Sequence, residues 1–449
     1  MRICSVRCGI TAALTTLTAL IAVLPVHAQQ PWTLRQCADY AVSHNISIQQ
    51  HQNQRQQREV QLSTARNLRL PDLNGSINEN FSFGRAQTLD GTYANRNTNN
   101  TSFSLSTTVP LFSGFQIPNQ IKLSQLNLEA AIQDLEKARN DVRMQVAKAY
   151  VQILYDMEVA DVAHRQIAID SAQVARLEAF VRNGKASQAD LSQQQATLSR
   201  AHLTATQADN AQALSLLALS QLLELPTPEG FTIVRPAVDG SLSRDFTALS
   251  PDAIYAEALA IKPEVQAEQL RLSASERSIN IAKGAGYPKL NFSAGLQTNY
   301  FKSSGMPAFT FFKQLDNNFS QYLALSLNVP IFSRFQTRNN IRLARIDRAN
   351  QELTLENVKK TLYKEIQQVY YNARAAHSKY ESSQTATASA RDAFELMQAK
   401  YENGKATITE FNESKNNYLK SESDLVQARY EYLYQTALLD FYQGKELNF

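Results

Sequence analysis

Glycine and proline are scarce in this chain of 449 residues, which contains only 14 glycines and 13 prolines. They are also unevenly placed. In residues 119–225 the only such residue is Gly184, and in residues 331–443 it is Gly404. Two long stretches with one helix breaker each exclude a loop-rich domain and a compact α/β domain, in which such residues end most elements. Both stretches are therefore expected to be long helices.

Long hydrophobic runs are absent except at the N-terminus, and the mean hydropathy is −0.35. This composition excludes a bundle of transmembrane helices. The one apolar run, residues 10–25, follows Arg2 and Arg7 and precedes small residues that end at Ala28. This order is typical of a signal peptide. Residues 1–28 are therefore expected to be an export leader that is cleaved near Ala28.

Cysteine is also rare. Of the three cysteines, Cys4 and Cys8 fall within the leader, so Cys37 remains alone and cannot form an internal disulfide. Neither leader cysteine lies at the cleavage point, and no lipid anchor is expected.

The chain also lacks a large net charge and recognisable catalytic motifs. Without Arg2 and Arg7 of the leader, 43 of the 45 basic residues remain against 41 acidic residues, and this balance of about +2 argues against nucleic acid as a partner. The six histidines are scattered, and there is no phosphate-binding glycine loop or nucleophile motif. The chain is therefore predicted not to be an enzyme and to hold no metal and no cofactor.

The sequence contains two copies of one unit. Three pairs of segments match in the same order: residues 71–74 with 288–291, residues 109–116 with 329–336, and residues 183–186 with 403–406. Recurrent helical turns could explain the third pair, but not the second, which reads VPLFSGFQ and VPIFSRFQ. We therefore divide the mature chain into a first repeat (29–225), a linker or equatorial region rich in proline and glycine (226–250), and a second repeat (251–449).

Each repeat is expected to hold the same elements in the same order. A helical segment of roughly 35 residues opens the repeat and stops before a proline, near Leu70 in the first copy and near Tyr287 in the second. Two strands follow, and a helical hairpin closes the repeat. The expected ranges are 72–84, 101–112 and 116–223 in the first repeat, and 289–302, 319–332 and 336–442 in the second.

The predicted strands alternate apolar and small polar residues. Leu290, Phe292 and Leu296, for example, alternate with asparagine, serine and glutamine. Each strand has about the 9–11 residues that a tilted strand needs to cross a bilayer. A soluble antiparallel sheet with one wet face produces the same pattern, so this feature alone leaves both readings open. Glu79 interrupts the apolar face of the first strand, which counts against a fully lipid-facing strand unless this residue lies at the membrane rim.

The long helices are predicted to pack as coiled coils and to turn back at the two isolated glycines. One seam steps by three and four residues through Leu355, Val358, Leu362, Ile366, Val369, Ala373, Ala376 and Tyr380. Asn-Gly suits a tight reversal, because both residues tolerate positive φ. Ser187 and Thr407 are placed to cap the returning helices.

Four strands cannot close a barrel, and an open sheet edge in lipid leaves backbone groups unpaired. Two copies would supply about eight strands, and the interior of an eight-stranded barrel is filled by its own side chains. Three copies would supply about 12 strands, and a barrel of that size leaves a lumen. A homotrimer is therefore expected if the chain is a channel. The alternative is a periplasmic coiled-coil scaffold or adaptor protein without a membrane barrel. Adaptors, however, carry β domains that flank one hairpin, rather than strands before each of two hairpins.

These features resemble the TolC-type outer-membrane efflux proteins, or outer membrane factors. The resemblance covers the whole mature chain: the duplication, the segment that leads from the second strand into each long helix, and the glycine turns. It implies a mostly α fold with a transmembrane β-barrel, in which a homotrimer forms a 12-stranded barrel surrounded by outer-membrane lipid, and a helical tunnel in the periplasm. It also implies a channel for tripartite efflux or type I secretion, with a periplasmic adaptor protein and an inner-membrane transporter as partners. The transported substrate stays open.

The resemblance further implies a gate at the periplasmic tips of the hairpins. Asp190 and Glu410 each lie six residues after a turn glycine, and Glu413 and Tyr401 match gate positions of the family. Three symmetry-related carboxylates repel one another and attract cations, so a ring of them can select ions and bind a blocking divalent ion. The alternative for each acid is a solvated residue that complements a helix N-terminus.

Adaptor contact is expected at the turns themselves: Asn183, Gly184, Lys185, Asn403, Gly404 and Lys405. Two positions depart from the family pattern. Ala406 stands where relatives have an arginine that holds the tip shut, and Gln193 is not acidic. We expect the closing contacts to differ from those of relatives, with the two turn lysines as candidate substitutes.

Overall fold

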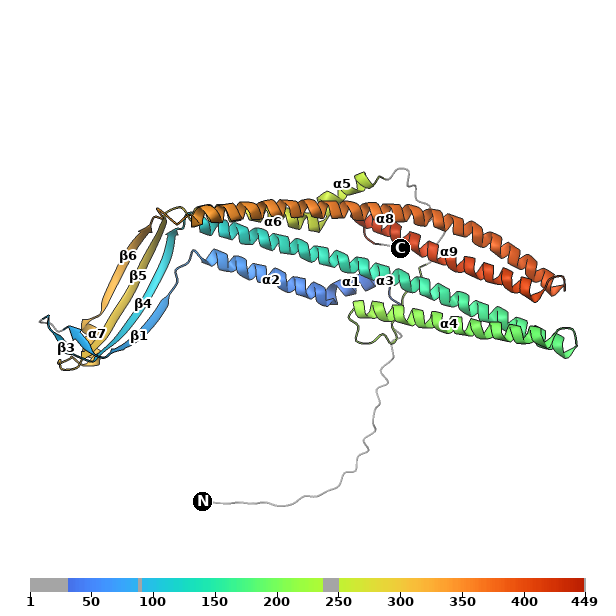
Figure 1. Cartoon of the computed structure of the whole chain (residues 1–449), viewed down its shortest axis with the longest axis horizontal. Helices are drawn as coiled ribbons and strands as arrows, with labels where there is room; N and C mark the ends of the chain where they lie inside the picture. Colours follow the sequence, from blue (N-terminus) through green and yellow to red (C-terminus); the bar gives the residue numbers. More distant parts are fainter. Residues whose placement is uncertain (1–30, 88–90, 237–249, 448–449) are drawn as a thin grey trace, which may run out of the picture.

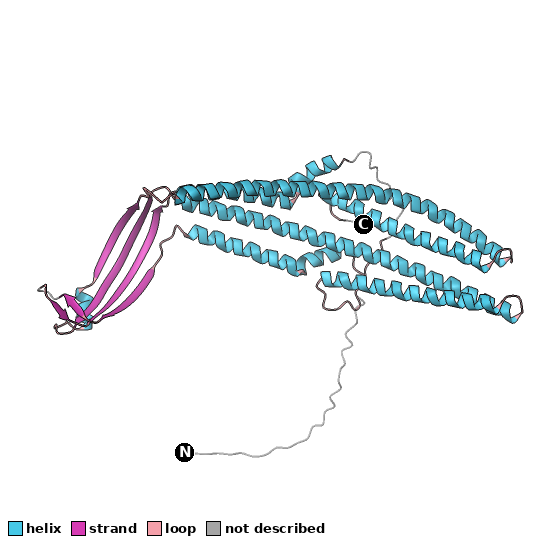
Figure 2. Cartoon of the chain, viewed as in Figure 1, coloured by secondary structure: helices cyan, strands magenta, loops and turns pink. Residues whose placement is uncertain are grey.

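The computed structural model describes residues 31–87, 91–236 and 250–447. A sheet lies at one end of an elongated molecule, and helices run from it to two hairpin turns at the other end (Figure 1). Figure 2 shows that helices make up most of the described chain. The predicted leader, residues 1–28, lies outside the described residues.

Both repeats contain the expected long helices. The first repeat holds α1 (Leu34–His44), α2 (Ile46–Asn67), β1 (Asn74–Ser82), β2 (Arg85–Gln87), β3 (Tyr93–Asn95), β4 (Thr98–Phe112), α3 (Gln116–Arg182) and α4 (Gln188–Leu222). The second holds α5 (Pro251–Ile261), α6 (Pro263–Gly284), β5 (Lys289–Ser303), α7 (Phe311–Asn317), β6 (Ser320–Asn328), α8 (Gln336–Glu402) and α9 (Ile408–Tyr442). Helices α3 and α8 have 67 residues each, and α4 and α9 have 35 each, so the two hairpins match in length.

The helical segment expected at the start of each repeat is present, and it consists of two helices rather than one. Asn45 follows the last residue of α1 and has an extended backbone conformation. Its side-chain oxygen accepts a hydrogen bond from the Ser47 N–H at 3.0 Å, which caps α2. In the second repeat Lys262 is extended because Pro263 follows it and begins α6. A capping residue and a proline thus divide each segment into two helices.

The main sheet is antiparallel and has the strand order β1-β4-β5-β6. Glu79, the acid on the apolar face of β1, pairs with Thr101 of β4 and accepts a hydrogen bond from its hydroxyl. A short second hairpin, β2–β3, lies between the two strands expected in the first repeat. Leu323, Leu325 and Leu327 of β6 are 79%, 66% and 63% exposed, so the apolar face of this strand is uncovered.

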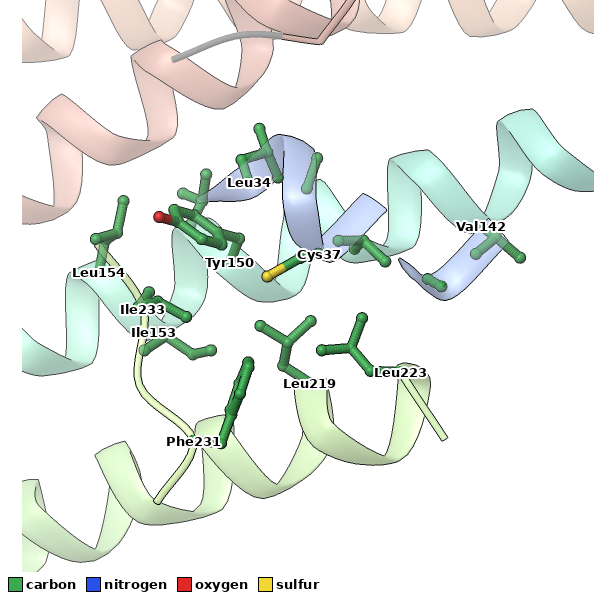
Figure 3. Packing of buried hydrophobic residues seen from close by; sticks show 14 of the residues in the cluster. Leu34, Cys37, Val142, Tyr150, Ile153, Leu154, Leu219, Leu223, Phe231 and Ile233 are labelled. Atoms are coloured by element: carbon green, nitrogen blue, oxygen red, sulfur yellow. The ribbon is translucent and has the colours of Figure 1, made fainter. Parts of the chain in front are cut away.

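The largest buried cluster lies where α1, α3 and the end of α4 meet (Figure 3). Cys37, Tyr150, Leu219 and Phe231 point toward one another there. The Tyr150 hydroxyl donates to the Val234 carbonyl at 2.6 Å, so the chain after α4 is held against α3. Burial raises the pKa of the Cys37 thiol to about 12, which disfavours the thiolate form.

The predicted seam of α8 is confirmed. Leu355, Leu362, Ile366, Ala373 and Ala376 are buried, and the second core cluster joins this seam to α5, α6 and α9. In the described ranges, no helix combines the length and the apolar character that crossing a membrane requires.

Candidate functional site at the hairpin tips

The two hairpin turns have the same backbone. Gly184 and Gly404 adopt φ values of 69° and 70°, a left-handed conformation that glycine accepts without strain. The Lys185 N–H donates to the Phe180 carbonyl at 2.8 Å, and the Lys405 N–H donates to the Lys400 carbonyl at the same distance. Each long helix therefore ends in the same glycine C-cap, and both turns lie at the end of the molecule opposite the sheet (Figure 1).

Two of the predicted gate acids belong to capping boxes. The Ser187 hydroxyl accepts from the Asp190 N–H at 3.1 Å and donates to the Asp190 carboxylate at 2.7 Å. Thr407 and Glu410 make the equivalent contacts at the start of α9, at 3.2 and 2.8 Å. The N–H and hydroxyl of Thr407 hold the pKa of Glu410 below its usual value. Within one chain, both acids thus stabilise helix N-termini, which is the alternative considered for them.

Tyr401 and Glu413 have different surroundings. Tyr401 stacks on Phe411, with ring centroids 5.0 Å apart, and the Arg176 guanidinium of α3 lies 5.3 Å from the Tyr401 ring centroid. Burial raises the pKa of Tyr401. Glu413 is exposed and makes no hydrogen bond or ion pair with the described residues. Tyr401 therefore joins the hairpins, and Glu413 is the acid left free.

Most of the remaining tip residues face solvent. Lys185 and Lys405 are exposed, and neither forms an ion pair within the part of the chain that the structure describes. Gln193 is exposed and Ala406 is half-buried. In relatives an arginine holds the tip shut, and the idea that Lys185 and Lys405 take over this role stays a prediction. It concerns contacts between copies of the chain.

A ladder of charged side chains joins α3 of the first hairpin to α9 of the second. Its three pairs are Glu158 with Arg429 at 3.1 Å, Arg165 with Glu422 at 2.6 Å, and Asp170 with Lys415. We call these six residues the inter-hairpin ladder. It runs from the middle of the hairpins toward the tips, where Arg176 donates to the Glu402 carbonyl at 3.0 Å. The two hairpins are thus tied to one another along their length.

The Asp170–Lys415 pair is completely buried, and both side chains are 0% exposed. Gln194 of α4 donates to the Asp170 carboxylate at 3.1 Å, and Asn412 of α9 donates to the Gln194 amide oxygen at 3.1 Å. The network therefore fixes α3, α4 and α9 together just behind the tips.

Sequence reasoning missed this network. The signal was present in α9, where Phe411, Lys415 and Leu419 recur every four residues and are all buried. A lysine at a core position of a coiled coil needs an acidic partner, but the sequence does not show which helix supplies it.

No three histidine, cysteine or carboxylate side chains lie close enough to hold a metal ion in residues 31–87, 91–236 and 250–447. The side chains at the tips are carboxylates, amides and cations at the end of a helical bundle. Such groups can attract, hold or exclude charged species.

Similar proteins share both the sequence pattern and the fold. Protein CyaE of Bordetella pertussis is 25% identical over 71% of this chain and 64% of its own length. Outer membrane efflux protein BepC of Brucella suis is 22% identical over 72% of this chain and 67% of its own. The chain thus spans about two thirds of the length of these curated relatives. The outer membrane protein VceC of Vibrio cholerae superposes with a TM-score of 0.76 at 16% identity, over 92% of this chain and 97% of that one.

The family profile described as outer membrane efflux protein matches residues 38–224 and 254–445. These two matched segments contain the two hairpins and the four main strands, and the gap between them falls at the linker of the duplicated sequence. With that match over most of its length, the chain belongs to the outer membrane efflux protein family.

Proposed function

We propose that three copies of this chain form an outer-membrane channel, with about 12 strands closing a barrel and the helices forming a periplasmic tunnel. The observation that carries the proposal is the open sheet, in which β1 and β6 are the outer strands. In lipid each unpaired backbone group on such an edge costs several kcal/mol. Pairing β6 of one copy with β1 of the next removes both edges.

The polarity of the sheet supports a membrane environment. The apolar side chains of β6 are exposed, whereas Ser326 and Asn328 alternate with them on the opposite face. A soluble sheet with one wet face packs its apolar face on a core. The uncovered apolar face favours the channel over the periplasmic scaffold or adaptor protein.

The tips are the surface that we assign to partners. We infer that a periplasmic adaptor protein binds the exposed turns and connects the channel to an inner-membrane transporter. The transporter would deliver the substrate, whether for efflux or for type I secretion, and the channel itself would carry out no catalytic step. The chemical class of the substrate is decided by the transporter rather than by the fold of the channel.

Glu413 is the residue that we assign to the pore constriction. Asp190 and Glu410 share the tips, but their carboxylates already accept hydrogen bonds in capping boxes. Three copies would bring three Glu413 carboxylates around one axis. Mutual repulsion would make this ring attract cations and bind divalent ions.

Conductance of the reconstituted assembly tests this assignment. Glu413→Gln removes the charge but keeps the size of the side chain, and it is expected to lower the preference for cations and to weaken the block by divalent ions. Asp392→Asn, at an exposed acid of α8, is the matched control and should change neither property. An unchanged cation preference in Glu413→Gln would show that the ring is not at the constriction.

Cell fractionation separates the channel from the alternative. A channel is recovered in the outer-membrane fraction and needs detergent for extraction. Recovery in the soluble periplasmic fraction without detergent would support the scaffold or adaptor protein instead.

A further inference from the structure

A stripe of arginines lies where the sheet passes into α8. Arg334 is in the turn before the helix, and Arg338, Arg342 and Arg345 follow at steps of four and three residues. These steps place the side chains on one face of the helix. All four are exposed, and none forms an ion pair with the described residues. We call these four residues the arginine stripe.

No acidic side chain among the described residues compensates this charge. A helix N-terminus carries a partial positive charge that disfavours cations, and the first turn of α8 contains no acidic residue. Arg348, on the next turn, shows the usual arrangement, because it pairs with Glu352 at 2.7 Å and Glu276 at 3.7 Å. The arginine stripe is therefore available to an anion from outside the chain.

The stripe is specific to the second repeat. At the corresponding positions, 220 residues earlier, the first repeat has Gly114, Pro118, Lys122 and Gln125. Gly114 is required there, since a Cβ would lie 2.5 Å from the Gly284 carbonyl oxygen. The duplicated fold thus does not demand arginines at these positions.

The hydrogen-bond pattern of the sheet sets the order of the strands around the proposed barrel. The Asp72 N–H donates to the Thr108 carbonyl, so even residues of β4 bond toward β1 and odd residues bond toward β5. The odd residues, such as Leu105 and Val109, form the apolar face. The chirality of L residues then fixes on which side of β4 each neighbouring strand lies. If the apolar face points outward, the strand order β1, β4, β5, β6 is clockwise around the barrel when the molecule is viewed from the sheet end.

The same view looks down α8 from its N-terminus, so its residues advance clockwise by about 100° each. Helix α6 lies on the side marked by Arg348 and Gln351, which contact Glu276 and Glu268 of α6. The arginine stripe lies about a quarter turn clockwise of that side. Helix α6 leads into β5 and β6 leads into α8, so α6 precedes α8 in the clockwise order. The face of α8 that carries the arginine stripe therefore points to the outside of the tunnel.

Exposed apolar side chains lie between the sheet and the stripe. Ile331, Phe332 and Phe335 are 94%, 71% and 58% exposed. Along the chain from the sheet toward the tips, the exposed leucines of β6 are followed by Phe332 and Phe335, which flank Arg334, and then by the three arginines of α8. This is the order of a bilayer boundary, where hydrocarbon gives way to the interface and then to phosphate.

We propose that the arginine stripe binds the phosphate groups of anionic phospholipids in the membrane leaflet that faces the helices. The inference rests on the proposed function, because it needs the apolar sheet to lie in a bilayer. Phosphate oxygens would satisfy the guanidinium groups that have no ion-pair partner among the described residues, and they would complement the helix N-terminus. The contact would fix the depth at which the channel sits.

Lipid binding to the detergent-extracted full-length assembly tests the proposal. Native mass spectrometry would follow titration with phosphatidylglycerol and with phosphatidylcholine. The triple variant Arg338→Gln, Arg342→Gln, Arg345→Gln is expected to lose about fivefold in affinity for phosphatidylglycerol per arginine. The matched control replaces Lys359, Lys360 and Lys364, further along α8, by glutamine and should bind as the unmodified chain does.

Three outcomes would overturn the proposal: equal phosphatidylglycerol binding by the arginine variant, an equal loss in the lysine control, or equal affinity for phosphatidylcholine. Inorganic phosphate is titrated separately, and displacement of the lipid by millimolar phosphate would assign the stripe to free anions instead. The mass and conductance of each assembly are read in parallel. Failure of the unmodified chain to conduct would contradict the proposed function, whereas these lipid results concern the stripe alone.

Discussion

Single residues in the inter-hairpin ladder differ in their access to water. Asp170 and Lys415 are completely buried, whereas Arg165 and Glu422 are 51% and 21% exposed. Exposed ion pairs contribute about 0–1 kcal/mol to stability. Removing one partner of a buried pair leaves an unpaired charge in a region of low dielectric, which costs about 3–5 kcal/mol.

We expect Lys415→Met to lower the free energy of unfolding by about 3–5 kcal/mol. The double variant Asp170→Leu, Lys415→Met should recover most of this loss, because no charge then stays buried. Lys405→Met, at an exposed lysine of the turn, is the control and should have little effect. Guanidinium unfolding in detergent measures all three, and a double variant that loses as much stability as Lys415→Met, or more, would contradict this account.

Lys262 is a second buried cation, and it makes stability depend on pH. Burial lowers its pKa to about 8, although the amine donates to the Phe441 carbonyl at 3.2 Å. The folded pKa lies below the ordinary value of 10.5, so the unfolded chain binds this proton more tightly. The resulting penalty, on the order of 3 kcal/mol, is present in full below pH 8 and disappears as the pH rises to about 10.5.

Lys262→Met is therefore expected to be more stable than the unmodified chain at pH 7, with a difference that shrinks between about pH 8 and 10. Unfolding midpoints of both proteins over this range measure it. Taking the difference between the two proteins removes the titration of other groups. A difference that stays constant with pH would mean that Lys262 keeps its ordinary pKa in the fold.

The local chemistry of the tips could be predicted from sequence, but the contacts across the helices could not. The turn glycines and the caps Ser187 and Thr407 depend only on neighbours in the chain, so their residue types reveal them. The partner of Lys415 depends on which helices meet, and that information lies 245 residues away at Asp170. A role for Glu413 depends on other copies of the chain and stays a prediction.

At the scale of secondary-structure elements, two kinds of glycine shape the fold. A Cβ on Gly284 would lie 2.5 Å from the Gly114 carbonyl oxygen, where α6 crosses the start of α3. A Cβ on Gly404 would have no atom within 4 Å, but its φ of +70° is strained for other residues. The first glycine permits close packing, and the second permits a turn.

Gly284→Ala is expected to separate α6 from α3 and to lower stability by up to about 3 kcal/mol, the range for overpacked sites. Gly404→Ala should lower stability by about 1 kcal/mol, because only backbone strain is added. Thermal unfolding followed by circular dichroism compares the two variants. A larger loss for Gly404→Ala would show that the helix crossing adapts to the added methyl group.

The elements that recur in both repeats were the easiest to predict. The repeated motifs place the long helices and the main strands, because hydrophobic period and turn residues agree in both copies. The break between α1 and α2 at Asn45 was missed, because an asparagine within a polar helical segment cannot be recognised as a helix cap from the sequence. The β2–β3 hairpin lies in a polar segment whose short strands have no apolar period.

At the scale of the whole molecule, a single chain has surfaces that we assign to other molecules. The sheet has two outer strands, its apolar face is exposed, and the tips present free cations and a free acid. The duplication and the family resemblance could be read from sequence, because they are properties of residue order. The proposed number of copies rests only on the need to pair β6 with β1 and to leave a lumen.

Single-channel recording of the purified full-length assembly in a planar bilayer tests the central claim most directly. We predict discrete conductance steps of a water-filled pore in protein whose native mass corresponds to three chains. Protein of that mass that inserts into the bilayer but carries no current above background would contradict the claim that this chain forms a channel.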